Sequence, residues 1–126
     1  MREIEVVLDG LGFPESTRWR DGRVWLSNWG AGEVLAVTPG GEREVVARLA
    51  PDTLPFSIDW LPDGRLLVVD GPRQLLLRQD PGGSLATLAD LGGIGSNWAV
   101  NSTHTLFVIL EAPRASRQTF RVVVGR

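Results

Sequence analysis

Three oxygen-bearing side chains recur along this 126-residue chain at nearly constant spacing. Glu15, Ser57 and Asn97 are separated by 42 and 40 residues, and each lies near the start of an apolar stretch. A carboxylate, a hydroxyl and an amide carbonyl are oxygen ligands that Ca²⁺ accepts flexibly and that Mg²⁺ binds with more retained water. The pattern predicts a divalent-metal site, with calcium preferred. The alternative is that these side chains only hold water in a channel.

A second polar set is expected at the same rim. If the strand that follows each of these positions returns antiparallel to the first, it brings Asn28, Asp70 and the nearby Glu111 back to the end at which the first strand began. Trp29 is next to this rim and could form a pocket wall, although packing between sheets is the alternative. We expect Ser57, Asn28, Trp29 and Glu111 to contact a substrate.

The elements that must position these residues follow from an internal repeat. "DGRVWLSN" from Asp21 and "DGRLLVVD" from Asp63 are 42 residues apart, and a weaker copy, "HTLFVIL", begins at His104. Each repeat holds short Val- and Leu-rich runs between Gly or Pro turns, and the Asp-Gly pairs predict two-residue hairpin turns. Four-stranded units of about 40 residues are typical of a β-propeller, an all-β fold.

Counting strands predicts an assembly. The expected blades cover residues 13–50, 55–92 and 95–126, and the third contains only three strands. Residues 2–9 resemble the fourth strands of the other repeats, so we expect them to form the outer strand of the last blade, within a single half-propeller domain of residues 1–126. Three blades leave two apolar faces in water, and a two-fold homodimer would close a six-bladed ring. A fragment of a longer chain and a complex with a separate second half are the alternatives.

Composition excludes several kinds of site and partner. The net charge is −2 and no basic run is interleaved with aromatic residues, so neither a nucleic acid nor a membrane surface is expected as a partner. The chain has no Cys, which excludes disulfides, thiolate metal sites and a Cys nucleophile. It has no run of 18 apolar residues and no signal-peptide pattern, so a cytoplasmic location is expected.

Parts of the sequence resemble the family of gluconolactonase, regucalcin (senescence marker protein) and lactonase-like six-bladed propellers. The resemblance rests on "LGFPESTRW", "DGRVWLSNWGAGEVLAV", "LPFSIDWLPDGRLLVVDG" and "ADLGGIGSNWAVN". It implies that Glu15 and Asn97 bind a divalent metal at the top of the channel. Family members hydrolyse lactones or esters, or are relatives without that activity. Their further three blades supply an Asn ligand and an Asp that is ligand and base, and this sequence contains neither; Trp98 also replaces an acidic residue.

The resemblance leads to a specific functional prediction. A metal-dependent hydrolase of small lactones or esters would use calcium, or magnesium, zinc or manganese, to polarise the carbonyl and to lower the pKa of a bound water. A carboxylate then takes the proton: Glu15 of the second copy is the first candidate for this base, and Asp70 is the reserve, with a solvated hairpin residue as its alternative reading. The competing function is a non-catalytic propeller that binds or assembles.

Overall fold

The computed structural model describes residues 4–50, 53–92, 97–100, 105–111 and 117–123, the last three ranges as backbone only. These residues form three antiparallel sheets that follow one another along the chain. The first contains β1 (Pro14–Arg20), β2 (Arg23–Asn28), β3 (Glu33–Val37) and β4 (Arg43–Arg48), with a 3-10 turn at Trp29–Ala31. The second contains β5 (Phe56–Trp60), β6 (Leu66–Asp70), β7 (Leu75–Gln79) and β8 (Leu85–Asp90). The third contains β9 (Asn97–Val100), β10 (Thr105–Glu111) and β11 (Arg117–Val123).

The strand register reproduces the sequence repeat residue by residue. Glu15 pairs with Ser27, Ser57 with Val69 and Asn97 with Ile109, so the first members of these pairs are equivalent positions in the three sheets. Loop hydrogen bonds repeat as well: the backbone N–H of Leu49 donates to the carbonyl of Gly32, and 42 residues later Leu91 donates to Gln74. Each sheet is one blade, and the arrangement is the predicted all-β half-propeller.

The two Asp-Gly turns differ in structure. Asp21 and Gly22 both have positive φ, 52° and 72°, which fits the predicted two-residue hairpin turn. The prediction is wrong for the second pair, where only Gly64 has positive φ and the N–H of Leu61 donates to the carbonyl of Arg65, giving a longer turn. Pro62 explains the difference, because its ring holds φ near −65° and so favours the first central position of a type I turn.

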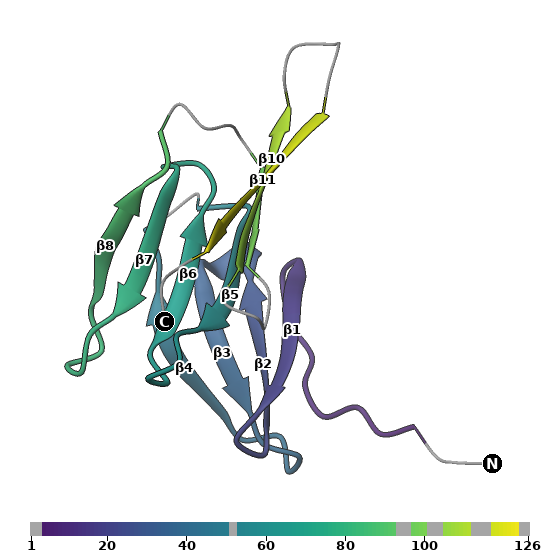
Figure 1. Ribbon diagram of the computed structural model, residues 1–126. Helices are drawn as coiled ribbons and strands as arrows, with labels where there is room; N and C mark the ends of the chain where they lie inside the picture. Colours follow the sequence, from purple (N-terminus) through teal and green to yellow (C-terminus); the bar gives the residue numbers. More distant parts are fainter. Residues whose placement is uncertain (1–3, 51–52, 93–96, 101–104, 112–116, 124–126) are drawn as a thin grey trace.

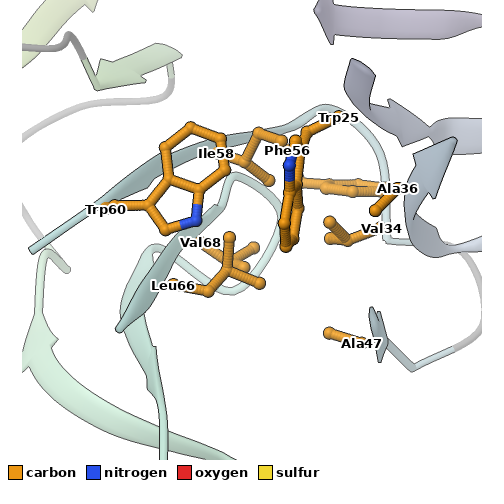
Figure 2. Close-up of a cluster of buried hydrophobic side chains, with 9 residues drawn as sticks. All are labelled: Trp25, Val34, Ala36, Ala47, Phe56, Ile58, Trp60, Leu66 and Val68. Atoms are coloured by element: carbon orange, nitrogen blue, oxygen red, sulfur yellow. The ribbon is translucent and has the colours of Figure 1, made fainter. Parts of the chain in front are cut away.

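The core lies between the first two blades, which are stacked face to face (Figure 1). Its buried side chains come from five strands of the two sheets and include Val34, Phe56, Ile58 and Val68 (Figure 2). Alternate residues of β2, β3, β5 and β6 point into this layer, as expected for strands covered on both faces. The fold therefore depends on contacts between blades as well as on pairing within each blade.

The other face of the first blade carries a smaller cluster. Leu26, Leu35 and Val37 form it, and Leu8 and Leu11 from the N-terminal segment pack against it. The described residues of that segment, 4–12, form no strand (Figure 1), and the outer strand expected from residues 2–9 stays a prediction. Its partner would be the free edge of β11, and pairing there in a closed ring stays a prediction. No helix among the described residues is long and apolar enough to span a membrane.

Candidate functional site

Glu15 lies on an irregular part of β1, the innermost strand of the first blade. The register of β1 with β2 shifts between Glu15 and Arg18, and Ser16 has a φ of 53°, which is uncommon for a residue with a side chain. The Glu15 side chain is exposed and has no hydrogen-bond or ion-pair partner among the side chains that the structure describes. Bulges of this kind re-aim side chains next to active sites. The carboxylate of Glu15 thus lies at the sheet edge, where no described side chain occupies it.

A close contact between two glycines fixes the start of β1. The N–H of Gly30 donates to the carbonyl of Gly12 at 2.7 Å, and a Cβ on Gly30 would lie 2.9 Å from the Cα of Gly12. The N–H of Gly12 donates in turn to Oδ1 of Asn28 at 2.9 Å. Asn28 was expected at the substrate rim, but its buried side chain holds the backbone that leads into Glu15. We therefore assign Asn28 a positioning role.

Ser57, the equivalent of Glu15 in the second blade, is buried, and its Oγ has no hydrogen-bond partner among the described residues. Its neighbours Phe56 and Ile58 point into the core between the first two blades, so alternation directs Ser57 to the opposite face. The third blade lies on that side, because β9 contacts β5 and β6. An unpaired buried hydroxyl is costly unless a partner reaches it. Ser57 thus offers an oxygen toward the third blade.

Asp70 has a different environment from the one expected of a base. Its buried carboxylate accepts the backbone N–H of Arg73 at 3.0 Å through Oδ1 and pairs with the Arg73 guanidinium at 3.1 Å through Oδ2. The same guanidinium donates to Oγ1 of Thr53 at 2.6 Å. These contacts join the β6–β7 turn to the segment that precedes β5. Both oxygens of Asp70 are therefore used in the fold, and the structure favours a structural role over the catalytic one.

Trp29 connects the first two blades. Its Nε1–H donates to the carbonyl of Phe56 at 2.7 Å, and its half-buried ring packs against the core cluster. The alternative reading of Trp29 as a residue between sheets fits these contacts better than a pocket wall. Asn97 is in β9 and Glu111 is in β10, one residue beyond Leu110, the equivalent of Asn28 and Asp70; their side chains are outside the described residues, and their place at the rim stays a prediction.

The sequence interpretation missed Ser27. This residue is fully buried, lies directly opposite Glu15 in the β1–β2 pair, and its Oγ has no hydrogen-bond partner among the described residues. No signal in the sequence indicates this pairing: the register set by the two-residue turn at Asp21–Gly22 would place Glu15 opposite Asn28, and the irregularity between Glu15 and Arg18 shifts its partner to Ser27. Ser27 thus adds a second hydroxyl near the candidate site.

The oxygen atoms at the candidate site are of the kind that a hard cation binds. Among the residues that the structure describes, they are too few to complete the coordination of such an ion. Carboxylate, hydroxyl and amide oxygens suit Ca²⁺, which takes about six to eight oxygens. Within the part of the chain whose side chains are described, no three His, Cys, Asp or Glu residues gather in a group that could hold a metal ion. Glu15 would be the anionic ligand, with Ser57 and Asn97 as neutral donors, and further ligands must come from elsewhere.

The clearest electrostatic effect is remote from this site. A side-chain hydrogen bond from Arg65, aided by the Arg65 backbone N–H, lowers the pKa of Asp63 below its usual 3.8. The same bond raises the pKa of Arg65. Both residues lie in the β5–β6 turn, at the opposite end of the strands from Ser57. This pair stabilises a turn and has no part in the candidate site.

Comparison with known proteins defines the class of fold. No protein-family model and no curated protein matches the chain. Among solved structures, it is similar to selenomethionine-substituted virginiamycin B lyase from Staphylococcus aureus, with a TM-score of 0.58, 13% identity, and coverage of 96% of this chain and 45% of that one. A streptogramin B lyase structure matches with a TM-score of 0.57, 9% identity, and coverage of 86% and 40%.

These structural neighbours are β-propellers, so the chain has a propeller fold and spans less than half the length of each neighbour. At such low identity the likeness concerns the fold. Membership of the gluconolactonase and regucalcin group stays a prediction.

Proposed function

We propose that this chain is the metal-binding part of a propeller enzyme that acts on small lactones or esters at the mouth of the channel. The observation that carries the proposal is the exposed carboxylate of Glu15, which lies on a distorted innermost strand and has no partner among the described side chains. Its repeat equivalents, Ser57 and Asn97, add oxygen donors at the same level of the next two blades. Backbone strain at Ser16 supports this reading, because strained residues cluster at functional sites.

The residues divide into ligands and supports. Glu15 and Asn97 would hold the ion, with Ser57 nearby, and the Gly12–Gly30 contact would keep Glu15 in place. Calcium in this position would polarise a substrate carbonyl and lower the pKa of a bound water. The Glu15 carboxylate of another copy would take the proton, because both oxygens of Asp70 are engaged in its own turn. The localisation we propose is cytoplasmic.

Two further observations define alternatives that the assay must separate. The structural neighbours are named as lyases, which break bonds without adding water, so the products must be identified as well as the rate. Among the described residues, no second carboxylate lies in a group with Glu15 that could act as the base. This observation favours the alternative of a non-catalytic module that binds a metal without converting a substrate. Hydrolysis carried out in ¹⁸O-labelled water incorporates the label into the acid product, and elimination does not.

The first test is calcium binding by titration calorimetry on the wild type and on Glu15→Gln. Loss of the anionic ligand that the described residues supply is expected to weaken binding at least tenfold. Glu42→Gln is the matched control, because Glu42 is also exposed and lies in the β3–β4 turn away from the site. Its affinity should equal that of the wild type. Equal calcium binding by wild type and Glu15→Gln, or none by either, contradicts the proposed site.

The second test is turnover of a panel of simple lactones and aryl esters with calcium and with EDTA. Activity that requires calcium and is lost in Glu15→Gln supports the enzyme. Metal binding that depends on Glu15 without turnover of any member of the panel supports the binding module instead. Because Asp70→Asn perturbs a turn, it should retain activity in proportion to the folded fraction.

A further inference from the structure

The outward face of the first blade is apolar and open. A groove of about 660 Å³ runs between this face and the N-terminal segment, and Trp19, Val24, Leu26 and Val37 line its floor. The residues beside it are unusually exposed for their type: Ile4 is 97%, Val6 76% and Trp19 66% exposed. An apolar surface of this kind on a soluble fold marks a contact with another molecule.

The position of the N-terminal segment shows what kind of element is missing. Leu8 and Leu11 pack on the Leu26, Leu35 and Val37 cluster, and the carbonyl of Val7 approaches Gly41 so closely that a Cβ there would lie 2.9 Å away. The segment thus lies over the face that a preceding blade would cover. The groove beside the segment leaves the rest of that face open.

The third blade has the complementary deficit. Among the residues that the structure describes, its strand order is β11–β10–β9, so β11 is an edge strand there, and the sheet has three strands where each of the first two has four. The first two blades carry a fourth strand beyond β3 and β7, the equivalents of β11. Within the described ranges, residues 4–12 thus belong to no sheet and β11 has an unpaired edge.

We propose that the third blade of a second copy docks on the open face of the first blade, with residues 4–8 added as the fourth strand along β11 of that copy. The exchange is reciprocal, so a two-fold dimer contains two such junctions and closes a ring of six four-stranded blades. The added strand would pair with the unpaired backbone groups along the edge of β11. Docking of the third blade would at the same time cover the apolar groove.

The repeat fixes the register of this junction. "IEVVL" at residues 4–8 aligns with "REVVA" at 43–47, where Val45 pairs with Leu35. Leu35 and Phe120 are equivalent positions, because they pair with Leu26 and Val108 in β2 and β10. Val6 is therefore placed opposite Phe120.

One position further along the same ladder, Glu5 falls opposite Arg121. Opposite charges directly across an antiparallel pair are favourable. The charged pair Glu5 and Arg121 and the apolar pair Val6 and Phe120 are thus both compatible with this register.

The decisive experiment uses the absence of Cys from the chain. In the double variant Val6→Cys and Phe120→Cys, oxidation should give a covalent dimer on a non-reducing gel. The control pair, Leu88→Cys with Phe120→Cys, places one thiol on β8 away from the junction and should stay uncrosslinked. An intrachain disulfide would show that the segment closes its own blade, and absence of any disulfide would show that it does not pair with β11; either result overturns the exchange.

Light scattering on the unmodified chain provides a test that does not depend on the Cys variants. The expected mass is twice the 13.7 kDa of one chain. Trp19→Lys should shift the population to monomers, whereas Leu88→Lys, a charge added at another exposed apolar residue, should leave the dimer intact. A monomeric wild type overturns the proposal and points to blades on a different polypeptide. EDTA should not change the mass. The proposal of a dimer and the proposal of a metal site can therefore be refuted independently of each other.

Discussion

The junction between the first two blades offers a quantitative test of the fold. Trp60 of β5 is 5% exposed, and its ring meets that of Trp25 in β2 edge to face, with centroids 5.2 Å apart. The guanidinium of Arg20 lies 4.8 Å from the centre of the Trp60 ring. Trp60→Leu keeps an apolar side chain at this position but removes both ring interactions. The variant therefore measures how much this junction stabilises the fold.

The expected loss can be estimated term by term. The edge-to-face pair contributes about 0.5–1.5 kcal/mol beyond burial. The cation–π contact adds about 0.5–1 kcal/mol, since Arg20 is partly exposed. The smaller leucine loses several buried carbon atoms at about 0.8 kcal/mol per CH₂, partly recovered by repacking. We expect Trp60→Leu to lower the free energy of unfolding by about 2–4 kcal/mol, a large share of the stability of a small domain.

Urea unfolding followed by far-UV circular dichroism, at one fixed protein concentration, measures this change. The midpoint should fall while the m-value stays constant. Leu88→Ala is the control, because Leu88 is exposed on β8, and its effect should stay within about 0.5 kcal/mol. A loss below about 1 kcal/mol for Trp60→Leu, or strict additivity with Trp25→Leu, would refute the view that these two rings stabilise the blade junction together.

Three further predictions concern single positions. Asp70→Asn should lower the free energy of unfolding by about 1–3 kcal/mol in urea titrations, because it weakens charge-assisted hydrogen bonds to Arg73, while calcium affinity stays unchanged. For Asp63, whose folded pKa lies below its usual 3.8, the stabilisation is present above that value and is lost as the pH falls through the folded pKa; the difference in urea midpoint between wild type and Asp63→Asn should therefore be largest at neutral pH and disappear in acid. Gly30→Ala should weaken calcium binding at Glu15 in calorimetry, since its Cβ would push the backbone at Gly12 away, whereas Gly82→Ala, in open space, should have no effect.

The sequence was sufficient to predict the blades because strand sequence and turn chemistry repeat together. The 42-residue offset that relates the two Asp-Gly pairs also relates the strand pairs of the first two sheets. Glu15, Ser57 and Asn97 were correctly aligned for the same reason. A repeat constrains every equivalent position at once, so an error of one residue would have reversed the faces of all strands.

Local features that depend on a single neighbouring residue could not be predicted from the sequence pattern. The role of Asp70 is set by Arg73, three residues away around a turn, and no pattern distinguishes that carboxylate from one that faces a channel. The longer turn at Asp63 follows from Pro62, whose effect was not included in the two-residue prediction. The N-terminal strand was predicted from its likeness to other strands, but a strand forms only where a partner offers its edge.

The location of Glu15 links the candidate site to the packing of the blades. The β1 bulge follows a backbone that is held by Gly30 and Asn28, and the next residue, Trp29, is bonded across to Phe56 of the second blade. A shift between the first two blades would therefore move the start of β1 and its carboxylate with it. Variants that loosen the blade junction, such as Trp60→Leu, should weaken calcium binding without changing any ligand. If affinity at Glu15 is unchanged in the folded Trp60→Leu protein, the site is positioned by its own sheet alone.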